Sequence, residues 1–279
     1  MKNKIYKTPK VRIWFGIGRK FTVIFLVFIL CPVGSLLIQL SGRSIEEKMK
    51  TFAVQSLEQM GKNMDAQIQT IDSIASSVLS NETVMHNLQY YSTMIPLEKQ
   101  SAETQIRTWL TGLSNLNMEI SGMYLFDRSN AFFYAKGRSP ALGYHVLQQD
   151  WYKKTLEADG ALVIFGTHEQ FHVEKQPEMV ITITRALKDF FSQEVIGVIM
   201  VDIPFEFLES VFHHADSHLS LDADTYVLDT DGTILFSREK EHLFNKFSPE
   251  LYARMTDDIG MVQDNINGVD AFTIYYTSP

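Results

Sequence analysis

Four patterns of apolar and polar residues follow one another along this chain of 279 residues. The first is a basic segment, residues 1–20, and the second is an uncharged, mostly apolar run, residues 21–40. From Ser44 to Tyr91 apolar side chains recur every three or four residues, which is the period of an α-helix. After Ile120 short aromatic and β-branched runs alternate with turn residues, which is typical of β-strands. The pattern predicts helices first and a sheet afterwards.

The apolar run is predicted to form a transmembrane helix over residues 21–41. Its length matches the ~30 Å hydrocarbon core of a bilayer at a rise of about 1.5 Å per residue. The preceding segment carries seven Lys and Arg residues and no acidic residue, so the N-terminus is expected in the cytoplasm and the bulk of the chain outside. A cleaved signal peptide is the alternative, because Gly34-Ser35 would suit a cleavage site. The apolar run continues past that pair to Leu40, which favours the anchor.

Composition limits the classes of function. With 45% apolar and 12% aromatic residues the chain is expected to fold, as one large or two small globular parts. Seven of the 25 basic residues precede Phe21, which leaves 18 against 33 acidic residues and argues against nucleic acid as a partner. The single cysteine, Cys31, lies in the apolar run, so the outer part has no disulfide, as is typical of a bacterial surface protein.

The helical part is expected to consist of two helices. One unbroken helix over residues 44–91 would reach about 65 to 70 Å, longer than a compact domain is wide. Pro96 suits the first turn of a second helix. Next comes a hairpin, Ile120 to Phe126 and Ala131 to Ala135, and then a short helix. Further strands are predicted at residues 161–165, 179–187 and 195–201.

A smaller module is predicted to repeat the sheet theme. Pro204 opens a connecting helix, and strands at 225–228 and 233–236 flank the turn Asp229-Thr-Asp-Gly232. A strand over residues 268–276 follows. The predicted fold class is therefore α+β, with a first module in 42–203 and a second, incomplete one in 204–279. We expect the chain to be a fragment, because a sheet this small needs more strands.

Three stretches of this sequence resemble one protein family. The first is the basic start, apolar run and long helix, and the second runs from Asp150-Trp-Tyr-Lys-Lys154 to Gly197-Val-Ile-Met-Val-Asp-Ile203. The third is Tyr226-Val-Leu-Asp-Thr-Asp-Gly-Thr-Ile234, with Asn267-Gly268 before the final strand. In this order they resemble the extracellular double Cache sensor region of YesM-like bacterial sensor histidine kinases, over nearly the whole chain.

The resemblance implies two PAS-like sheets carried by the long helix, with a small ligand in the membrane-distal one. It also implies a homodimer and an output through a cytoplasmic histidine kinase and its response regulator. No phosphoacceptor histidine block and no Gly-rich ATP lid occur in these 279 residues, so we expect no catalytic residue and no cofactor. The alternatives are the sensor of a chemoreceptor or of a cyclic-nucleotide enzyme, or a standalone anchored solute-binding protein.

The resemblance also names candidate ligand-binding residues. In amino-acid-binding double Cache domains an Arg two residues before a Trp-Tyr pair grips the ligand carboxylate, and a later Asp takes the amine. Trp151, Tyr152 and Asp202 match, but Gln149 replaces the Arg and cannot supply its charge. Trp151 and Tyr152 would otherwise be core residues, and Asp202 would otherwise complement the dipole of the following helix.

Tyr124, Tyr134 and Arg185 lie on strands that line the pocket in this family. Alternate strand residues face opposite sides of a sheet, and the sequence does not fix the register. Aromatic faces with a few polar groups suit a sugar or a small polar organic ligand, which is the ligand class we predict.

His168-Glu169-Gln170-Phe171-His172 spells a zinc-protease motif. That chemistry needs both histidines one turn apart on a helix, with the glutamate next to the metal-bound water. The motif lies between two predicted strands and is soon followed by Pro177, so we expect neither a helix nor a metal there.

Overall fold

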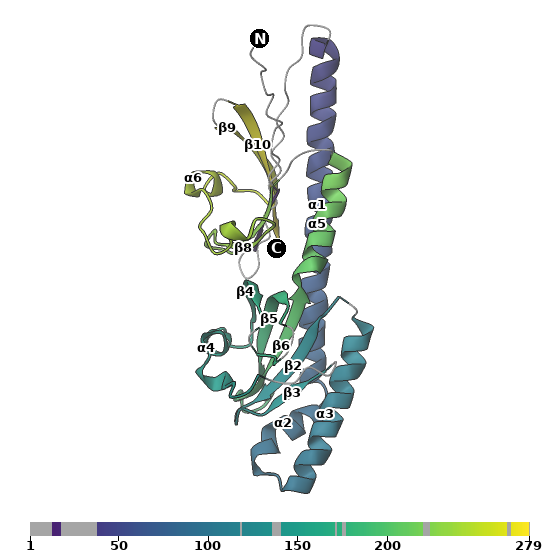
Figure 1. Cartoon of the computed structure of the whole chain (residues 1–279), viewed down its shortest axis with the longest axis vertical. Helices are drawn as coiled ribbons and strands as arrows, with labels where there is room; N and C mark the ends of the chain where they lie inside the picture. Colours follow the sequence, from purple (N-terminus) through teal and green to yellow (C-terminus); the bar gives the residue numbers. More distant parts are fainter. Residues whose placement is uncertain are drawn as a thin grey trace. The chain divides into compact units, whose positions relative to one another are not determined.

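The computed structural model describes most of the chain in two compact units. The middle unit comprises residues 67–208, and the split unit comprises residues 1–66 and 209–279 (Figure 1). The described residues are 13–17, 38–117, 119–135, 141–170, 172–174, 177–219, 224–266 and 269–278. Most of the predicted transmembrane segment, residues 21–37, lies outside them. Within the part described, no helix is both long enough and apolar enough to cross a bilayer.

The predicted single helix over residues 44–91 is wrong in one respect, because it is two helices. Helix α1, Ile38–Leu79, ends before Asn81, and α2, Glu82–Tyr90, begins there. The side chain of Asn81 accepts a hydrogen bond from the backbone N–H of Val84 at 3.0 Å, which caps the new helix. Helix α3, Pro96–Leu116, starts at its proline as predicted.

The middle unit contains a five-stranded antiparallel sheet in the order β3-β2-β6-β5-β4. Its strands are β2 Gly122–Asp127, β3 Phe132–Tyr134, β4 Leu162–Glu169, β5 Met179–Lys188 and β6 Val195–Pro204. These confirm the predicted hairpin and the three strands after it. Helix α4, Asp150–Glu157, packs against β4, β5 and β6, and α2 packs against β2 and β6.

Register decides which side chains of the central strands share a face. Tyr124 of β2 pairs with Met200 of β6, and Gly122 pairs with Asp202. Thr182 of β5 also pairs with Asp202. Because side chains alternate along a strand, these residues face the same side, the side on which Thr155 of α4 reaches β5.

The split unit has its own five-stranded sheet, in the order β8-β7-β1-β10-β9. Its strands are β1 Ile13–Ile17, β7 Thr225–Leu228, β8 Ile234–Ser237, β9 Ile259–Ile266 and β10 Val269–Ser278. β7 with β8 and β9 with β10 form antiparallel hairpins, whereas β1 runs parallel to β7 and β10. Helix α6, Pro249–Tyr252, lies in this unit, and α5, Phe205–Leu219, begins in the last residues of the middle unit and continues into the split unit. Neither β1 nor β9 was predicted from the sequence.

Strand β10 is fastened to the part of α1 that belongs to the split unit. The hydroxyl of Tyr276 donates to Asp65 at 2.7 Å, and Ser278 donates to the same carboxylate. Gly61 permits this approach, since a Cβ there would lie 2.2 Å from the Tyr276 ring. The turn of α1 that contains Gly61 and Asp65 thus packs closely against β10.

Candidate functional site

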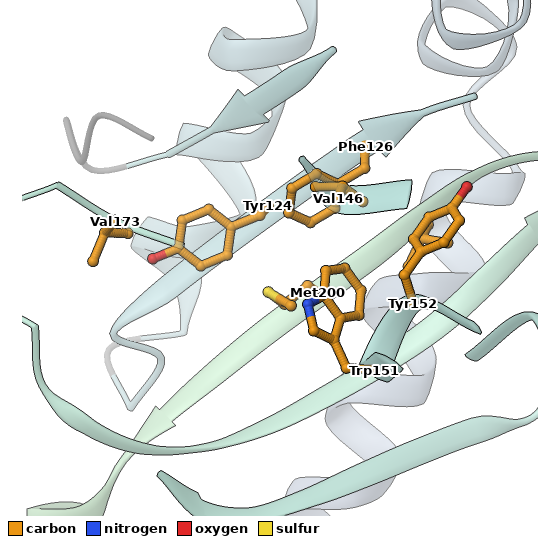
Figure 2. Close-up of a cluster of buried hydrophobic side chains, with 8 residues drawn as sticks. Tyr124, Phe126, Val146, Trp151, Tyr152, Val173 and Met200 are labelled. Atoms are coloured by element: carbon orange, nitrogen blue, oxygen red, sulfur yellow. The ribbon is translucent and has the colours of Figure 1, made fainter. Parts of the chain in front are cut away.

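Aromatic side chains gather on the α4 side of the middle-unit sheet (Figure 2). The cluster joins residues from β2, β6, α4 and the loops before α4 and β5. Its buried members are Tyr124, Phe126, Val146, Trp151, Tyr152, Val173, Val198 and Met200. Phe132, Tyr134, Tyr144, Leu156 and Phe165 pack against it and are partly buried. We call this set the aromatic cluster.

Helix α4 positions two of these aromatic residues. Trp151 and Tyr152 are both buried, and the Trp151 indole donates to the hydroxyl of Tyr144 at 2.7 Å. The hydroxyl of Thr155 bonds that of Thr184 on β5 at 2.6 Å, which fixes the helix on the sheet. Burial raises the pKa of Tyr144, so its phenol stays neutral and can accept from the indole.

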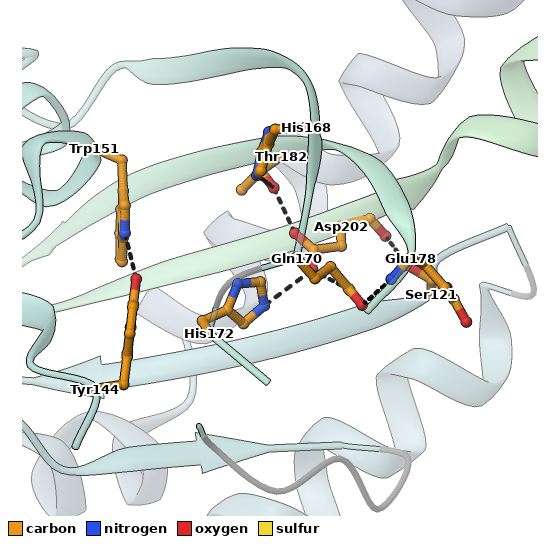
Figure 3. A network of polar contacts seen from close by, with 9 residues as sticks. All are labelled: Ser121, Tyr144, Trp151, His168, Gln170, His172, Glu178, Thr182 and Asp202. Atoms are coloured by element: carbon orange, nitrogen blue, oxygen red, sulfur yellow. Dashed lines mark hydrogen bonds and ion pairs between the residues drawn. The ribbon is translucent and has the colours of Figure 1, made fainter. Parts of the chain in front are cut away.

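Asp202 of β6 lies at the edge of the aromatic cluster and is fully buried. Its Oδ1 accepts from Thr182 and its Oδ2 accepts from Gln170, each at 2.6 Å, and His172 Nε2 lies 3.1 Å from the same Oδ2 (Figure 3). Burial by itself raises the pKa of a carboxyl group, but the contacts with His172, Thr182 and Gln170 outweigh it and hold the pKa of Asp202 below its usual value. The site therefore contains a buried negative charge.

His172 connects this carboxylate to the aromatic cluster. Its ring is fully buried and meets the Tyr124 ring edge to face at 4.5 Å between centroids. The rings of Phe132 and Tyr144 lie 6.5 and 6.4 Å away. An imidazole is thus held among three aromatic rings with one nitrogen on a carboxylate.

The His-Glu-x-x-His motif is not helical, as expected. His168 and Glu169 end β4, which is an extended strand and not a helix. His168, Gln170 and His172 lie at alternate positions and reach Thr182 or Asp202, whereas Glu169 is exposed. The glutamate cannot serve a metal held by the two histidines in this arrangement.

Among the described residues, three metal-ligating side chains cluster at one place only, away from this motif. That group is Glu239, Glu241 and His242 of the split unit, and two of its three members are exposed.

Five of the six predicted ligand-binding residues lie together. Tyr124, Trp151 and Tyr152 belong to the aromatic cluster, Tyr134 packs against it, and Asp202 reaches it through His172. In addition, the Arg107 guanidinium lies over the Tyr134 ring, 4.2 Å from its centroid.

Arg185 lies apart from the other predicted residues. Its Nε donates to the Gly160 carbonyl at 2.7 Å and its Nη1 donates to Asp72 of α1 at 2.8 Å. Arg185 follows Thr184 directly on β5, so the alternation of strand residues turns it away from the aromatic cluster.

Four residues of the site were not predicted to bind a ligand. They are Tyr144, Gln170, His172 and Thr182. A signal for two of them was present, since His168, Gln170 and His172 are polar at alternate positions next to a strand. Tyr144 lies in a loop, where no helix or strand periodicity indicates which way the side chain points.

Comparisons with known proteins agree with this architecture. The Cache domain family profile dCache_1 matches residues 40–279. The methyl-accepting chemotaxis protein McpA of Bacillus subtilis is 24% identical over 196 residues, which are 68% of this chain and 26% of McpA. This chain therefore spans about a quarter of that relative.

Solved structures of chemoreceptor ligand-binding domains share the fold. The ligand-binding domain of Campylobacter jejuni Tlp3, in complex with L-norvaline, matches with a TM-score of 0.55 at 16% identity. The match covers 88% of this chain and 95% of the Tlp3 chain. The ligand-binding domain of Pseudomonas aeruginosa PctC, in complex with GABA, matches with a TM-score of 0.52 at 14% identity. The match covers 83% of this chain and 98% of the PctC chain.

Proposed function

The chain belongs to the Cache domain family, and we propose that it is the sensor region of a bacterial membrane receptor whose middle unit binds a small polar molecule. The observation that carries this proposal is the buried, ionised Asp202 beside the aromatic cluster. A buried carboxylate can accept from a polar ligand, and neighbouring aromatic rings can cover its apolar part, which together fix and orient a small molecule.

The ligand we propose is a small polar organic molecule with a hydrogen-bond donor for Asp202 and an apolar face for the aromatic rings. Sugars and amines meet this description. Free amino acids, which the Tlp3 and PctC relatives make plausible, would also need a partner for their carboxylate. Gln149 holds the position of the expected arginine, and its amide donates to the His145 carbonyl at 3.0 Å in its own turn.

A ligand screen tests this proposal on the whole chain in detergent. We expect at least one sugar or amine to raise the melting temperature of the wild-type protein, with binding confirmed by calorimetry. Asp202→Asn and Trp151→Ala are expected to lose that response. Tyr252→Phe is the control, since it removes a hydrogen bond of the split unit, from Tyr252 to the Thr230 carbonyl. If no compound binds, or if Asp202→Asn binds equally well, the proposal is wrong.

The chain is proposed to be anchored by residues 21–41, with residues 1–20 in the cytoplasm and the rest outside the cell. The support is the charge asymmetry of the sequence. Strand β1 lies in the basic segment and pairs with β7 and β10, which would then be on the other side of the membrane. In an anchored chain β1 must therefore leave the sheet. Protease protection of residues 1–20 in sealed cells tests this, because cleavage from outside would contradict the anchor.

The output is proposed to be a histidine kinase acting on a cytoplasmic response regulator, in a homodimer. The support is the likeness of the three sequence stretches to YesM-like kinases. A chemoreceptor output is the second candidate, favoured by the match to McpA. Sequencing the gene beyond the codon for Pro279 distinguishes the two outputs. A histidine kinase predicts a phosphoacceptor histidine and an ATP-binding domain, whereas a chemoreceptor predicts a methyl-accepting signalling domain.

A further inference from the structure

The His172 side chain occupies the site as a bound molecule would. Its imidazole is fully buried, packs edge to face on Tyr124, and has Phe132 and Tyr144 nearby. Its Nε2 lies 3.1 Å from Asp202 Oδ2. Rings on several sides and a carboxylate at one end form the environment that recognises an organic cation, because aromatic faces and a carboxylate both attract positive charge.

The two hydrogen bonds that Asp202 accepts do not depend on His172. Thr182 donates to Oδ1 and Gln170 donates to Oδ2. If the imidazole moved away, the carboxylate would keep two hydrogen bonds and could accept another donor on Oδ2. The vacated space would be that of one five-membered ring.

We propose that His172 is an internal ligand of this site, and that the external ligand is a small organic cation that binds by displacing the imidazole from Asp202. This inference rests on the proposed function and narrows its ligand class from polar molecules to amines and other organic cations. His172 then determines specificity, because a ligand must interact with Asp202 and the aromatic rings more favourably than the tethered imidazole does.

The test is chemical rescue of a His172→Ala chain. Removing the imidazole leaves a buried carboxylate beside an imidazole-sized space, which free imidazole or ethylammonium should fill. At tenfold above its dissociation constant, either cation is expected to raise the melting temperature of His172→Ala by about 3 °C. The wild-type chain, whose site is occupied, should shift by less than about 1 °C under the same conditions.

Two controls assign the rescue to this site and to charge. His168→Ala removes a neighbouring imidazole whose Nε2 contacts Thr182 at 3.2 Å, not Asp202, so imidazole should not stabilise it specifically. Pyrazole has the shape of imidazole but is neutral at pH 7, and it should rescue His172→Ala less well than imidazole. Rescue by pyrazole without rescue by ethylammonium would overturn the assignment to cations. A folded His172→Ala chain that no cation stabilises would overturn the internal-ligand proposal.

A second variant covers the case in which His172→Ala does not fold. His172→Gln places an amide N–H near Asp202 but loses the ring contacts, so the glutamine side chain should compete with an external cation for Asp202 less strongly than histidine does. We expect ethylammonium to bind His172→Gln at least about tenfold more tightly than wild type, since the competing state is less populated. Equal affinities would contradict the proposal. A wild-type ligand screen that succeeds with neutral sugars would separate failure of this inference from failure of the proposed function.

Discussion

At the residue scale, Asp202 shows how a charge is kept in an apolar site. Two residues donate hydrogen bonds to it, Thr182 of β5 and Gln170 directly after β4, and His172 Nε2 lies 3.1 Å from its Oδ2. Replacing it with asparagine removes the negative charge that Gln170, Thr182 and His172 all contact. We expect Asp202→Asn to lower the free energy of unfolding at pH 7 by about 2 kcal/mol, the range for hydrogen bonds to a charged group. Urea unfolding of both chains measures this, and an unchanged value would contradict the account.

The same substitution has a predictable pH dependence. The pKa of Asp202 is lower in the folded chain than its ordinary value of about 3.9. A depressed carboxyl pKa contributes stability above the unfolded-state pKa, and the contribution is lost as the pH falls through the folded-state pKa. The stability difference between wild type and Asp202→Asn should therefore shrink as the pH falls below about pH 4. A difference that grows in acid would show that Asp202 is not stabilised as an anion.

The absence of a side chain at Gly122 leaves room for the Tyr124 side chain in the site. A Cβ at Gly122 would lie 2.1 Å from the Tyr124 hydroxyl, well inside contact distance. Gly122→Ala should displace that ring and destabilise the middle unit by about 1 to 3 kcal/mol, as overpacking does. Gly112→Ala is the matched control, because a Cβ there meets nothing within 4 Å and alanine favours the helix. Melting curves that rank both variants alike would contradict this assignment.

Sequence reasoning found the aromatic residues of the site but not the contacts of the polar ones. Trp151, Tyr152 and Tyr124 were named through the resemblance to double Cache sensors, and the predicted short helix and hairpin gave the elements that carry them. Arg185 could not be placed, since a register shift of one residue exchanges the faces of β5. The partners of Asp202 come from residues 20 and 32 positions away in sequence, and local patterns carry no information about such pairs.

At the element scale, Arg185 joins strand β5 to helix α1. The same strand carries Thr182 and Thr184, which touch Asp202 and Thr155 on its other face. A displacement of β5 by a ligand would therefore reach α1 through the contact of Arg185 with Asp72.

A double-mutant cycle measures this contact. The Asp72 side chain is about half exposed, so solvent weakens the pair, and a coupling of about 0.5 kcal/mol is expected between Arg185→Ala and Asp72→Asn. Arg185→Ala should cost more than Asp72→Asn, because it also removes the bond to the Gly160 carbonyl. Additive effects in urea unfolding would show that β5 and α1 are not linked through this pair.

Helices and strands with a regular spacing of apolar residues could be predicted from the sequence, but the residues at which they end were harder to predict. The apolar period of α1 continues into α2, which hid the break that the Asn81 cap creates. Strand β9 was missed because Gln263, Asp264 and Asn265 interrupt its apolar residues, and pairing with β10 overrides their low β-propensity. The Asn267-Gly268 pair in the sequence was an available hairpin signal.

At the scale of the whole molecule, the two units repeat one design. In each, an aspartate at a hairpin turn accepts from the backbone two and four residues later: Asp127 from Ser129 and Ala131, and Asp229 from Asp231 and Thr233. Both turns contain a residue with φ near 74°, Asn130 in one and Gly232 in the other. The two hairpins therefore use the same turn chemistry with different residues.

The sheets also share a strand order, apart from their central strand. β2 and β3 correspond to β7 and β8, and β4 and β5 correspond to β9 and β10. The central place belongs to β6 in the middle unit, antiparallel to both neighbours, and to β1 in the split unit, parallel to both. The internal repeat thus predicts an antiparallel strand at the place that β1 holds, so β1 is the element that a competing strand could replace.

Deleting residues 2–20 tests how firmly β1 holds that place. If β1 completes the sheet, its loss leaves β7 and β10 each with one open edge, and their amide protons should exchange with solvent faster, while those of β5 and β6 stay protected. Hydrogen exchange read by mass spectrometry on both chains in detergent reports each strand separately. Equal protection of β7 and β10 in the two chains would mean that β1 adds nothing to the sheet. That outcome would leave the basic segment free for the cytoplasmic position that its charge predicts.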